Sequence, residues 1–441
     1  MNIIIAGAGT VGYLLSLSLS IKHNVIVIDK DIKKLERLDD EIDIYVIKGD
    51  IEDPKTYKEL PIEKADLFIA VADSDEANLL ATLIAEDVVD IGKKIVRLKN
   101  DGFVKSHVLQ KLSIDYAIFP DILTAKRIKS LLAFPKANNV KAFHQSKHKL
   151  ISIKIQTKEH KAYRIKDIRQ KDIRVIGLER AKKLFIPSLD EELQNGDLVY
   201  LYGSVEKISS LASKLDEFMP ESIKRVVIFG ANTQAQKIAL ALLSKDVEIK
   251  MIEKDTTLCK EASALLGENV MVINSAYEDH KLFEEEGIKY ADMVIAAGHN
   301  DEKNIVKCVE AKEYGIPKVV AINNDKSYYN LMHKMGLVVV RGSKASANFE
   351  ILEKISSSSI VTQRHYCGGM GVLFMRKIYP NSKLIDKTIK HKSIKDTKVL
   401  ITRDDTIYDA NELQTFKQDD IVVVAGDIKR KEEMQQWIYS L

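Results

Sequence analysis

Cysteine is scarce in this sequence of 441 residues. The three cysteines, Cys259, Cys308 and Cys367, stand far apart, and none belongs to a CxxC pair or to a Cys/His cluster with metal-ligand spacing. Neither a disulfide framework nor a structural zinc site is indicated, and we predict no metal site. A chain without disulfides fits a reducing compartment, so we expect the protein to be cytoplasmic.

An excess of either charge is also missing. The chain carries 67 Lys and Arg residues against 64 Asp and Glu residues, which is a formal net charge of +3. This balance removes the main electrostatic reason for binding a polyanion, and we predict no nucleic-acid partner.

Long apolar segments are missing as well. Residues 1–21 contain no charged side chain. However, Gly7, Gly9 and Gly12 interrupt this segment, and it lacks the basic n-region of a signal peptide. They therefore indicate a strand, a turn and a helix rather than a signal peptide or a membrane span. No other segment approaches about 18 uncharged apolar residues, so we expect any membrane association to be peripheral.

Internal similarity, in contrast, is abundant. Four blocks of the first half recur in the second half at a shift of about 225 residues, which indicates a tandem duplication with almost no gaps. The matching blocks are 2–12 with 225–235, 25–29 with 248–253, 65–72 with 291–298, and 75–78 with 301–304.

Each copy begins with short β-branched runs that alternate with helical stretches. In the first copy these runs predict strands near residues 2–6, 24–29, 44–48, 67–71, 94–98 and 116–119. One of the predicted helices, at residues 76–86, carries an apolar face made of Leu79, Leu80, Leu83 and Ile84. Further short strands follow in each copy, near 150–155, 175–178 and 198–202, and near 372–378, 399–402 and 421–425.

This alternation predicts an α/β protein. We expect two tandem Rossmann-type, doubly wound parallel sheets, each followed by a small α+β lobe. The expected domains are residues 1–134 and 223–356 for the Rossmann lobes, and residues 135–220 and 357–441 for the small lobes.

A glycine-rich loop with the pattern GxGxxG, residues 7–12, follows the first predicted strand and precedes a predicted helix. In this context the pattern is typical of a dinucleotide-binding site. Gly7 permits a tight turn, Gly9 lets the backbone approach a pyrophosphate, and Gly12 allows close packing of helix on strand. Asp29 ends the second strand about 20 residues after Gly9, where a carboxylate accepts hydrogen bonds from ribose hydroxyls and favours NAD(H) over NADP(H). The residues predicted to hold the nucleotide are Gly7, Ala8, Gly9, Thr10, Val11, Gly12 and Asp29.

Other candidates stand at the carboxyl ends of strands, where open α/β sheets bind their ligands. Asp50 follows the third strand, where it would contact the adenosine end or, alternatively, cap the next helix. Arg97 ends the fifth strand, where it would reach a phosphate or pair with a carboxylate. Ala72 and Asp73 follow the fourth strand and would lie along the ligand, next to two competing helix caps, Ser74 and Asp75.

The second copy keeps few of these features. Its loop retains only the first glycine, Gly230, and Asn232 places a side chain where a pyrophosphate would approach. Ala276 and Asn323 replace the acidic and basic candidates of the third and fifth strands. Because an acidic residue, Glu253, still ends the second strand, Gly230 and Glu253 are weak candidates for a second site. We expect one working nucleotide site per chain and a mainly structural second Rossmann lobe.

Together these motifs resemble a known family. The most specific element is the helix start Asp75-Glu76-x-Asn78 after Ala65-Asp66, which recurs as Asp301-Glu302-x-Asn304. With the duplicated lobes, the glycine loop and Gly49-Asp50, the chain resembles the tandem regulator-of-potassium-conductance (RCK) family over essentially its whole length.

The resemblance implies a non-catalytic sensor with NAD(H) or ATP/ADP as its regulatory ligand. It also implies a homo-oligomeric ring, expected to be a tetramer, that lies peripherally on the inner face of the cell membrane and gates a TrkH-like potassium transporter of the Trk type. Many relatives that respond to ATP carry an arginine inside the glycine loop, whereas this chain has Thr10, which argues against a strong grip on a γ-phosphate.

An amphipathic helix predicted at residues 121–132 follows the sixth strand. It would cross between lobes or subunits and transmit the nucleotide state, with packing inside one chain as the alternative. Its apolar residues are Ile122, Leu123, Ile128, Leu131 and Leu132.

An NAD-dependent dehydrogenase is the rival interpretation, because the same glycine loop serves hydride transfer. Such an enzyme needs a general acid or base near the nicotinamide. The small lobes offer no convincing set: His144 and His148 fall in a predicted solvated linker, and His365 and Cys367 fall in a predicted loop. We therefore predict no catalytic residues.

Overall fold

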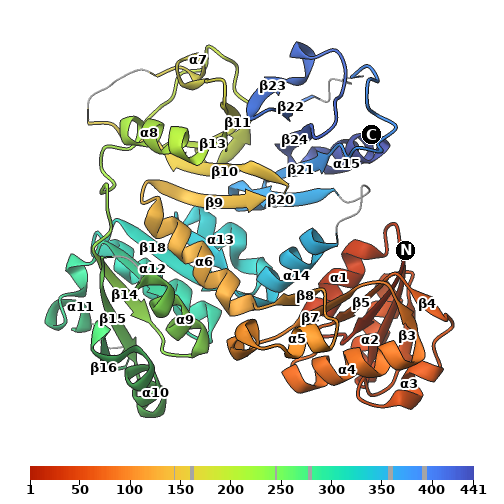
Figure 1. The fold of residues 1–441 in the computed structure, drawn as a ribbon. Coiled ribbons are helices and arrows are strands. Elements are labelled where there is room, and N and C mark those ends of the chain that lie inside the picture. Colours follow the sequence, from red (N-terminus) through yellow and green to blue (C-terminus); the bar gives the residue numbers. More distant parts are fainter. Residues whose placement is uncertain (144, 159–162, 244–245, 277–280, 356–360, 390–394) are drawn as a thin grey trace. The chain divides into compact units, whose positions relative to one another are not determined.

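The computed structural model describes residues 1–143, 145–158, 163–243, 246–276, 281–355, 361–389 and 395–441 (Figure 1). It confirms the predicted α/β fold: the described residues form two six-stranded Rossmann-type sheets, two five-stranded sheets and a two-stranded sheet of β4 (Lys64–Ala65) and β6 (Asp90–Ile91). The chain divides into two compact units, Met1–Ala125 with Arg341–Ile355 and Lys126–Val340 with Ser356–Leu441, called unit 1 and unit 2 below. In the described ranges, no helix is long and apolar enough to cross a membrane.

The first Rossmann sheet lies in unit 1 and has the strand order β3-β2-β1-β5-β7-β8. All its pairs are parallel, and the chain reverses direction across the sheet between β1 and β5, which is where such folds bind ligands. The central strands are buried, which explains their runs of apolar and β-branched residues. The strands are β1 (Asn2–Ala6), β2 (Asn24–Asp29), β3 (Tyr45–Lys48), β5 (Leu67–Ala70), β7 (Lys94–Arg97) and β8 (Tyr116–Ile118).

Helices α1 (Thr10–Leu19), α2 (Ile32–Glu41), α3 (Pro54–Lys58), α4 (Asp75–Val88) and α5 (Val108–Lys111) connect these strands. The predicted apolar face of α4 is wrong for two of its leucines, because Leu80 is 41% exposed and Leu83 is 50% exposed. The side chains that α4 buries instead are small or polar: Ala77, Asn78, Ala81, Thr82 and Ala85. Small residues let the helix backbone lie close to the sheet.

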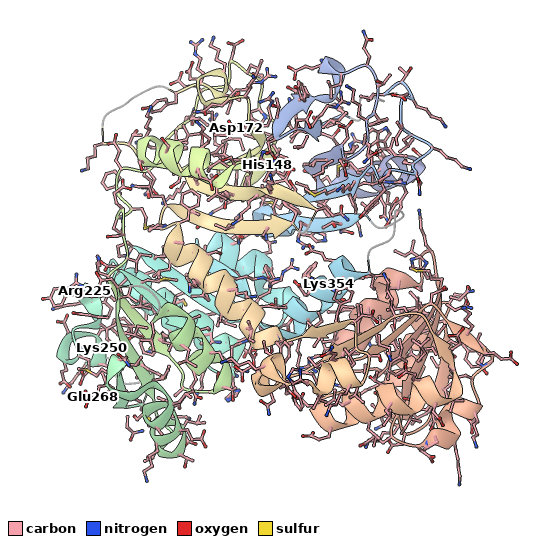
Figure 2. All side chains as sticks on the ribbon, in the orientation of Figure 1. His148, Asp172, Arg225, Lys250, Glu268 and Lys354 are labelled. Carbon is pink, nitrogen blue, oxygen red and sulfur yellow. The ribbon has the colours of Figure 1, made fainter. Side chains whose placement is uncertain are left out.

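Unit 1 also contains α14 (Ser343–Lys354), which comes from the second repeat. This helix contacts α1 and β8. Buried hydroxyls meet where α14 passes the first turns of α6 (Pro120–Ala133), since Thr124 Oγ1 lies 3.4 Å from Ser346 Oγ. At the far end of the helix, Lys354 Nζ lies 5.3 Å from the centre of the Tyr116 ring (Figure 2).

The second Rossmann sheet lies in unit 2 and has the order β16-β15-β14-β17-β18-β19, which repeats the first sheet. Helices α9 (Thr233–Leu242), α10 (Thr256–Leu266), α12 (Asp301–Glu313) and α13 (Tyr329–Lys334) belong to it. The strands are β14 (Arg225–Phe229), β15 (Glu248–Glu253), β16 (Val270–Asn274), β17 (Met293–Ala296), β18 (Lys318–Asn323) and β19 (Val338–Arg341).

Helix α6 (Pro120–Ala133) contains the helix predicted at residues 121–132. From Lys126 onward its residues belong to unit 2. Of the five apolar residues named for this helix, Ile128, Leu131 and Leu132 are buried. The end of the helix therefore packs against structure that is distant in sequence.

The two small lobes share one topology. Their sheets have the orders β12-β11-β13-β10-β9 and β23-β22-β24-β21-β20, so that each strand has a counterpart. Each lobe ends in a helix, α8 (Val205–Leu215) or α15 (Lys431–Ser440). The strands are β9 (Ala137–Phe143), β10 (Ser146–Lys154), β11 (Ile173–Arg180), β12 (Lys183–Phe185), β13 (Leu198–Gly203), β20 (Thr362–Tyr366), β21 (Gly371–Lys377), β22 (Thr397–Arg403), β23 (Thr406–Asp409) and β24 (Ile421–Asp427).

One hydrophobic core joins the two small lobes. It combines Leu150, Tyr200 and Tyr202 of the first lobe with Leu373 and Val423 of the second. Burial of apolar surface on both sides therefore holds the two sheets together.

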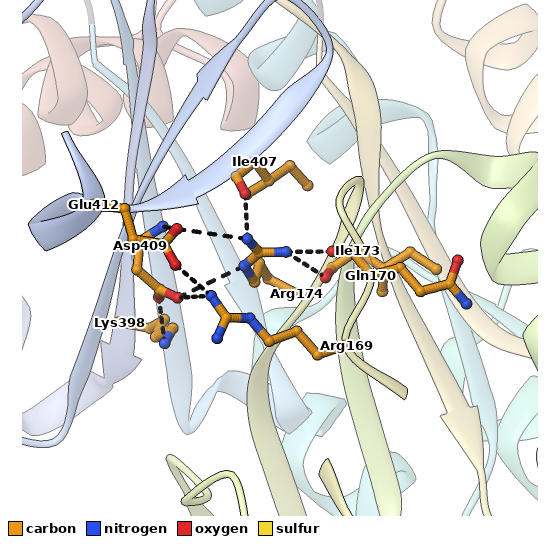
Figure 3. A network of polar contacts seen from close by, with 8 residues as sticks. All are labelled: Arg169, Gln170, Ile173, Arg174, Lys398, Ile407, Asp409 and Glu412. Atoms are coloured by element: carbon orange, nitrogen blue, oxygen red, sulfur yellow. Dashed lines mark hydrogen bonds and ion pairs between the residues drawn. The ribbon is translucent and has the colours of Figure 1, made fainter. Parts of the chain in front are cut away.

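A polar network lies at the rim of this core (Figure 3). Asp409 is its centre: it accepts a hydrogen bond from Arg169 Nη2 at 2.8 Å, it pairs with Lys398, and it lies 3.7 Å from Arg174 Nε. Burial lowers the pKa of Arg174, as does its neighbour Arg169, while Asp409 and Glu412 oppose this shift. The negative charges of Asp409 and Glu412 therefore offset the burial and the mutual repulsion of Arg169 and Arg174.

We expect Asp409→Asn to lower the free energy of unfolding by about 1–3 kcal/mol, because three cations lose their common counter-ion. Urea unfolding at low and high salt measures this loss of stability. Salt should reduce the loss only partly, because the side chain of Asp409 is largely buried.

The matched control is Asp405→Asn. Asp405 pairs with Lys147 at 3.4 Å between exposed side chains, so its loss should cost less than about 1 kcal/mol. Asparagine also tolerates the positive φ of 61° at this position. Equal losses in both variants would contradict a special role for Asp409.

Candidate functional site

The glycine loop between β1 and α1 needs its three glycines for different reasons. Gly7 has a φ of +109°, and a methyl group there would lie 2.9 Å from the backbone nitrogen of Ala72. A methyl group on Gly12 would lie 1.9 Å from the carbonyl oxygen of Gly7. A methyl group on Gly9, in contrast, would meet no atom within 4 Å. Internal packing thus explains Gly7 and Gly12 but leaves Gly9 unexplained.

The start of α1 makes this open position chemically useful. Gly9 is the N-cap of α1 and no side chain caps the helix. Free backbone N–H groups at a helix start and the positive end of the helix dipole attract anions. The loop residues Ala8, Thr10 and Val11 flank this position, so the space above Gly9 suits a phosphate group.

Asp29 stands beside the loop at the end of β2. Its Oδ2 atom accepts a hydrogen bond from the backbone nitrogen of Ala8 at 2.7 Å, and its Oδ1 atom accepts one from Asp31 at 2.9 Å. The carboxylate is half-buried and each oxygen can accept a further hydrogen bond. Its place and chemistry fit the contact to ribose hydroxyls predicted from the sequence.

Asp50 follows β3 and does not cap the next helix. That cap is Asp53, whose side chain accepts from Lys55 N, so the alternative role considered for Asp50 is wrong. Asp50 Oδ1 accepts a hydrogen bond from the backbone nitrogen of Glu52 at 3.1 Å, and Lys30 Nζ lies 4.0 Å from Oδ2. Its side chain is 45% exposed and remains available to an adenosine group.

Ala72, Asp73 and Arg97 meet at the ends of β5 and β7. Arg97 Nη1 lies 3.3 Å from Asp73 Oδ1 and 3.3 Å from the carbonyl oxygen of Ala72. Burial opposes the ionisation of Asp73, but its hydrogen bond to Arg97 and the charge of Arg97 lower the pKa of Asp73. The Nε atom of Arg97 is buried and has no hydrogen-bond partner in the described structure. Arg97 thus pairs with a carboxylate, which was one of its two predicted roles. The ion pair uses only one of its nitrogens, so a contact to a phosphate, the other predicted role, stays open.

The repeated helix start after Asp73 has a structural role that the sequence did not reveal. Asn78 accepts from Ala72 N at 2.8 Å and donates to the carbonyl oxygens of Ala72 and Arg97, both at 2.9 Å. Asp75 accepts from the backbone nitrogens of Lys99 and Asn100 at 2.8 Å. Ser74 is the helix cap. These bonds fasten the ends of β5 and β7 to α4 and so position the site.

The same arrangement recurs in the second Rossmann lobe. Asn304 accepts from Gly298 N at 2.9 Å and donates to the carbonyl oxygens of Gly298 and Ile322 at 3.0 Å. Asp301 accepts from the backbone nitrogens of Asn324 and Asp325. The motif thus fastens the same strand ends to the same helix in both lobes.

Both repeats match models of known protein families. Residues 3–120 and 226–341 match the TrkA-N domain, and residues 163–216 match the TrkA-C domain. The chain belongs to the TrkA family. The two TrkA-N matches coincide with the two Rossmann lobes, and the TrkA-C match falls in the first small lobe.

Relatives share most of the chain. A Trk system potassium uptake protein TrkA homolog from Archaeoglobus fulgidus is 30% identical over 396 residues, which are 88% of this chain and 88% of that protein. TrkA homolog 2 from Methanosarcina mazei is 25% identical over 440 residues, 96% of this chain and 97% of that protein. The solved GsuK channel bound to NAD has the same fold, with a TM-score of 0.60 and 18% identity over 100% of this chain and 79% of that chain.

The second TrkA-N lobe fills its own loop with side chains. Asn232 stands in the place of Gly9, where its amide donates to the carbonyl oxygen of Ala297 at 2.7 Å and accepts from Ala235 N at 3.0 Å. Asn232 therefore caps α9, whereas α1 has no side-chain cap. Glu253 is buried and accepts from the backbone nitrogens of Ala231, Lys254 and Asp255.

These bonds engage both the amide of Asn232 and the carboxylate of Glu253 within the protein. The side chain of Asn232 takes the space that is open above Gly9 in the first lobe. The two TrkA-N lobes thus share one backbone fold. They differ at the N-cap of the helix after the first strand, which is Gly9 in the first lobe and Asn232 in the second.

The histidines considered for catalysis lie elsewhere. His148 is not in a solvated linker, since it lies on β10, is buried, and its ring centre is 5.6 Å from that of Tyr202 (Figure 2). Residue 144 lies outside the described residues. His365 lies on β20 rather than in a loop, next to Cys367 in the second small lobe. His148 and His365 are on strands of the small lobes, not at the ends of the Rossmann strands.

Proposed function

We propose that this TrkA family chain is a nucleotide-sensing regulatory subunit of a membrane potassium transporter. The open position above Gly9 carries the proposal, because the fold does not require a glycine there and a bound phosphate does. The names of the relatives, which are potassium uptake proteins, support the link to potassium transport.

The proposed ligand is NAD(H) or ATP/ADP, one molecule per chain, in the first TrkA-N lobe. The loop from Gly7 to Gly12 would hold the phosphates, Asp29 the ribose and Asp50 the adenosine end. Ala72, Asp73 and Arg97 would line the loop edge, with Arg97 near a phosphate. The negative charge of Asp29 favours NAD(H) over NADP(H), because it would repel a 2′-phosphate.

The proposed mechanism is a population shift between two arrangements of the protein. A ligand changes such an equilibrium only through its different affinities for the two states. A coupling free energy of about 1–3 kcal/mol would change transport about 5- to 150-fold. Helix α6 is the proposed transmitter, since it begins in the first TrkA-N lobe and its later residues pack in unit 2.

The proposed assembly is a homo-oligomeric ring, expected to be a tetramer, on the inner face of the cell membrane below a TrkH-like transporter. Leu80 and Leu83 support an assembled state, because they are large apolar residues that α4 turns away from its own core. An apolar pair on one helix face is suited to contact a second copy. Size-exclusion chromatography with light scattering measures the number of chains.

The affinity for nucleotide tests the site. Asp29→Ala should weaken NADH binding about 10- to 100-fold, because the hydrogen bonds of a charged carboxylate to ribose are lost. Isothermal titration calorimetry with NADH, NAD⁺, ATP and ADP measures both affinity and stoichiometry.

The matched control is Glu253→Ala. It removes a carboxylate at the same place in the second TrkA-N lobe, so it should lower stability while leaving nucleotide affinity nearly unchanged. Equal losses of affinity in the two variants would contradict a single working site, and binding of two molecules per chain would contradict the role assigned to Asn232.

The dehydrogenase alternative predicts turnover. Purified protein mixed with NADH and a panel of hydroxy and keto acids should leave the NADH absorbance unchanged under our proposal. Steady oxidation or reduction of the nicotinamide would overturn the sensor assignment in favour of an enzyme.

A further inference from the structure

Three metal-ligating side chains from distant parts of the sequence meet inside unit 2. Glu179 belongs to β11 of the first small lobe, His333 to α13 of the second Rossmann lobe, and Cys367 to the turn that precedes β21 of the second small lobe. One ligand atom of each lies within 4.8 Å of the others. We infer that Glu179, His333 and Cys367 form a binding site for a zinc-type divalent metal ion.

The distances between the ligand atoms fit such an ion. Glu179 Oε2 lies 2.7 Å from His333 Nε2 and 3.1 Å from Cys367 Sγ, and Sγ lies 4.0 Å from Nε2. Tetrahedral zinc with its usual bond lengths places such atoms about 3.3–3.6 Å apart. Movements of about half an ångström, within the reach of small side-chain rotations, would convert the hydrogen-bonded cluster into a three-ligand site with water as the fourth ligand.

The chemistry of the donors selects the metal. One sulfur, one nitrogen and one oxygen suit Zn²⁺ and similar late transition metals, whereas Ca²⁺ and Mg²⁺ require oxygen ligands. Glu179 and Cys367 are 4% and 3% exposed. A carboxylate and a thiolate together balance the two positive charges of the ion, so the loaded site would be electrically neutral in a buried place.

In the metal-free site the sulfur of Cys367 takes part in a hydrogen bond. Burial raises the pKa of the Cys367 thiol, and the charge of Glu179 raises it further. The thiol donates a hydrogen bond to Glu179 Oε2 at 3.1 Å. Binding of Zn²⁺ would replace the sulfur–hydrogen bond with a sulfur–metal bond and release the proton to solvent.

The backbone around the cysteine is shaped for this cluster. Cys367 has a φ of +53°, which is uncommon for a residue with a side chain and occurs preferentially at functional sites. At Gly368, a methyl group would lie 2.7 Å from His333 Cδ2, so only glycine lets the turn approach the imidazole ring. Tyr200 donates to Glu179 Oε2 at 3.1 Å and so orients the carboxylate.

One cation stands nearby. Lys182 Nζ lies 3.8 Å from Glu179 Oε1 and is 49% exposed, so it can turn into solvent when a metal ion binds. The bound ion would then tie the second Rossmann lobe to both small lobes through one centre. This role does not depend on the nucleotide site.

Metal binding to the full-length protein tests the inference. Protein treated with a chelator and desalted should bind one Zn²⁺ per chain in competition with a chromophoric chelator, and its unfolding temperature should rise by several degrees. Cys367→Ser should weaken binding at least 100-fold and abolish the thermal shift, and Glu179→Gln should weaken it as well. Cys259→Ser, which changes another buried free cysteine, should leave both unchanged.

Cobalt provides a readout that needs no variant. Co²⁺ bound at this site should show the thiolate-to-metal charge-transfer band and the strong visible bands of a tetrahedral ion. Weak octahedral bands without charge transfer, no stoichiometric Zn²⁺, or equal binding by Cys367→Ser would each overturn the inference.

Discussion

Gly9→Ala should leave the protein folded and abolish its nucleotide binding. The backbone at Gly9 has φ −64° and ψ −173°, which alanine adopts easily, and a methyl group there meets no protein atom within 4 Å. Alanine at a helix N-cap costs about 1 kcal/mol at most relative to glycine. A phosphate that approaches the backbone would be displaced by the methyl group and would lose several charged hydrogen bonds, so affinity should fall at least about 100-fold.

Calorimetric titration and thermal unfolding of the same samples separate the two effects. Gly12→Ala is the informative contrast, because its methyl group would overlap the carbonyl oxygen of Gly7 and should damage both stability and binding. Asn232→Ala in the second lobe should lose a helix cap, at a cost of about 1 kcal/mol, without changing binding. Normal affinity of Gly9→Ala for every nucleotide would show that no phosphate passes over this residue.

The contrast between the two TrkA-N lobes could be predicted because it depends on local sequence. A glycine replaced by Asn232 changes the phosphate position directly, and the shift between the repeats shows which residues correspond. The structure adds the reason for the fold of the second lobe, since the amide of Asn232 forms both the cap and the contact to Ala297. The replacement that fills the position of Gly9 is thus also the source of these internal hydrogen bonds.

The sheets could be predicted for a similar reason. Buried parallel strands such as β1 require continuous apolar runs, and these runs are visible in a single sequence. The face of α4 could not be predicted, since Leu80 and Leu83 have helical spacing but the close approach of helix and sheet selects alanines instead. Hydrophobicity therefore predicted the helix correctly but misplaced two of the four residues of its buried face, since Leu79 and Ile84 do pack against the core.

Contacts between distant segments were beyond the reach of sequence patterns. Glu179 and His333 are separated by 154 residues, and Cys367 lies a further 34 residues along the chain. Metal sites are recognised in a sequence when their ligands lie at short, regular spacing. Here three separate elements each supply one ligand, so only the packing of the lobes of unit 2 brings them together.

Lys318 offers a comparable long-range contact with a measurable effect on stability. It is buried in β18, and its Nζ atom donates to the carbonyl oxygens of Pro135 at 2.7 Å and Ala137 at 2.8 Å, with Leu131 at 3.4 Å. These carbonyl groups lie at and just after the end of α6, where helical backbone lacks partners. Lys318 thus binds the end of the proposed transmitter helix to the second Rossmann sheet.

Lys318→Met should lower the free energy of unfolding by about 2–4 kcal/mol at pH 9, because the apolar side chain leaves buried carbonyl oxygens without donors. Lys94→Met is the matched control at the same place in the first sheet. Lys94 Nζ bonds Glu86, a half-exposed carboxylate, rather than carbonyl groups, so its loss should cost about 1 kcal/mol or less. Urea unfolding measures both variants.

The pH dependence of this deficit identifies its cause. Burial lowers the pKa of Lys318 from its usual value of 10.5 to about 7, so between these two values the folded protein has released a proton that the unfolded chain still binds. Wild-type stability should therefore rise with pH across this window relative to Lys318→Met, and the deficit of the variant should be larger at pH 9 than at pH 6. A deficit that is independent of pH would show that the ammonium stays charged in the fold, held by its three carbonyl groups.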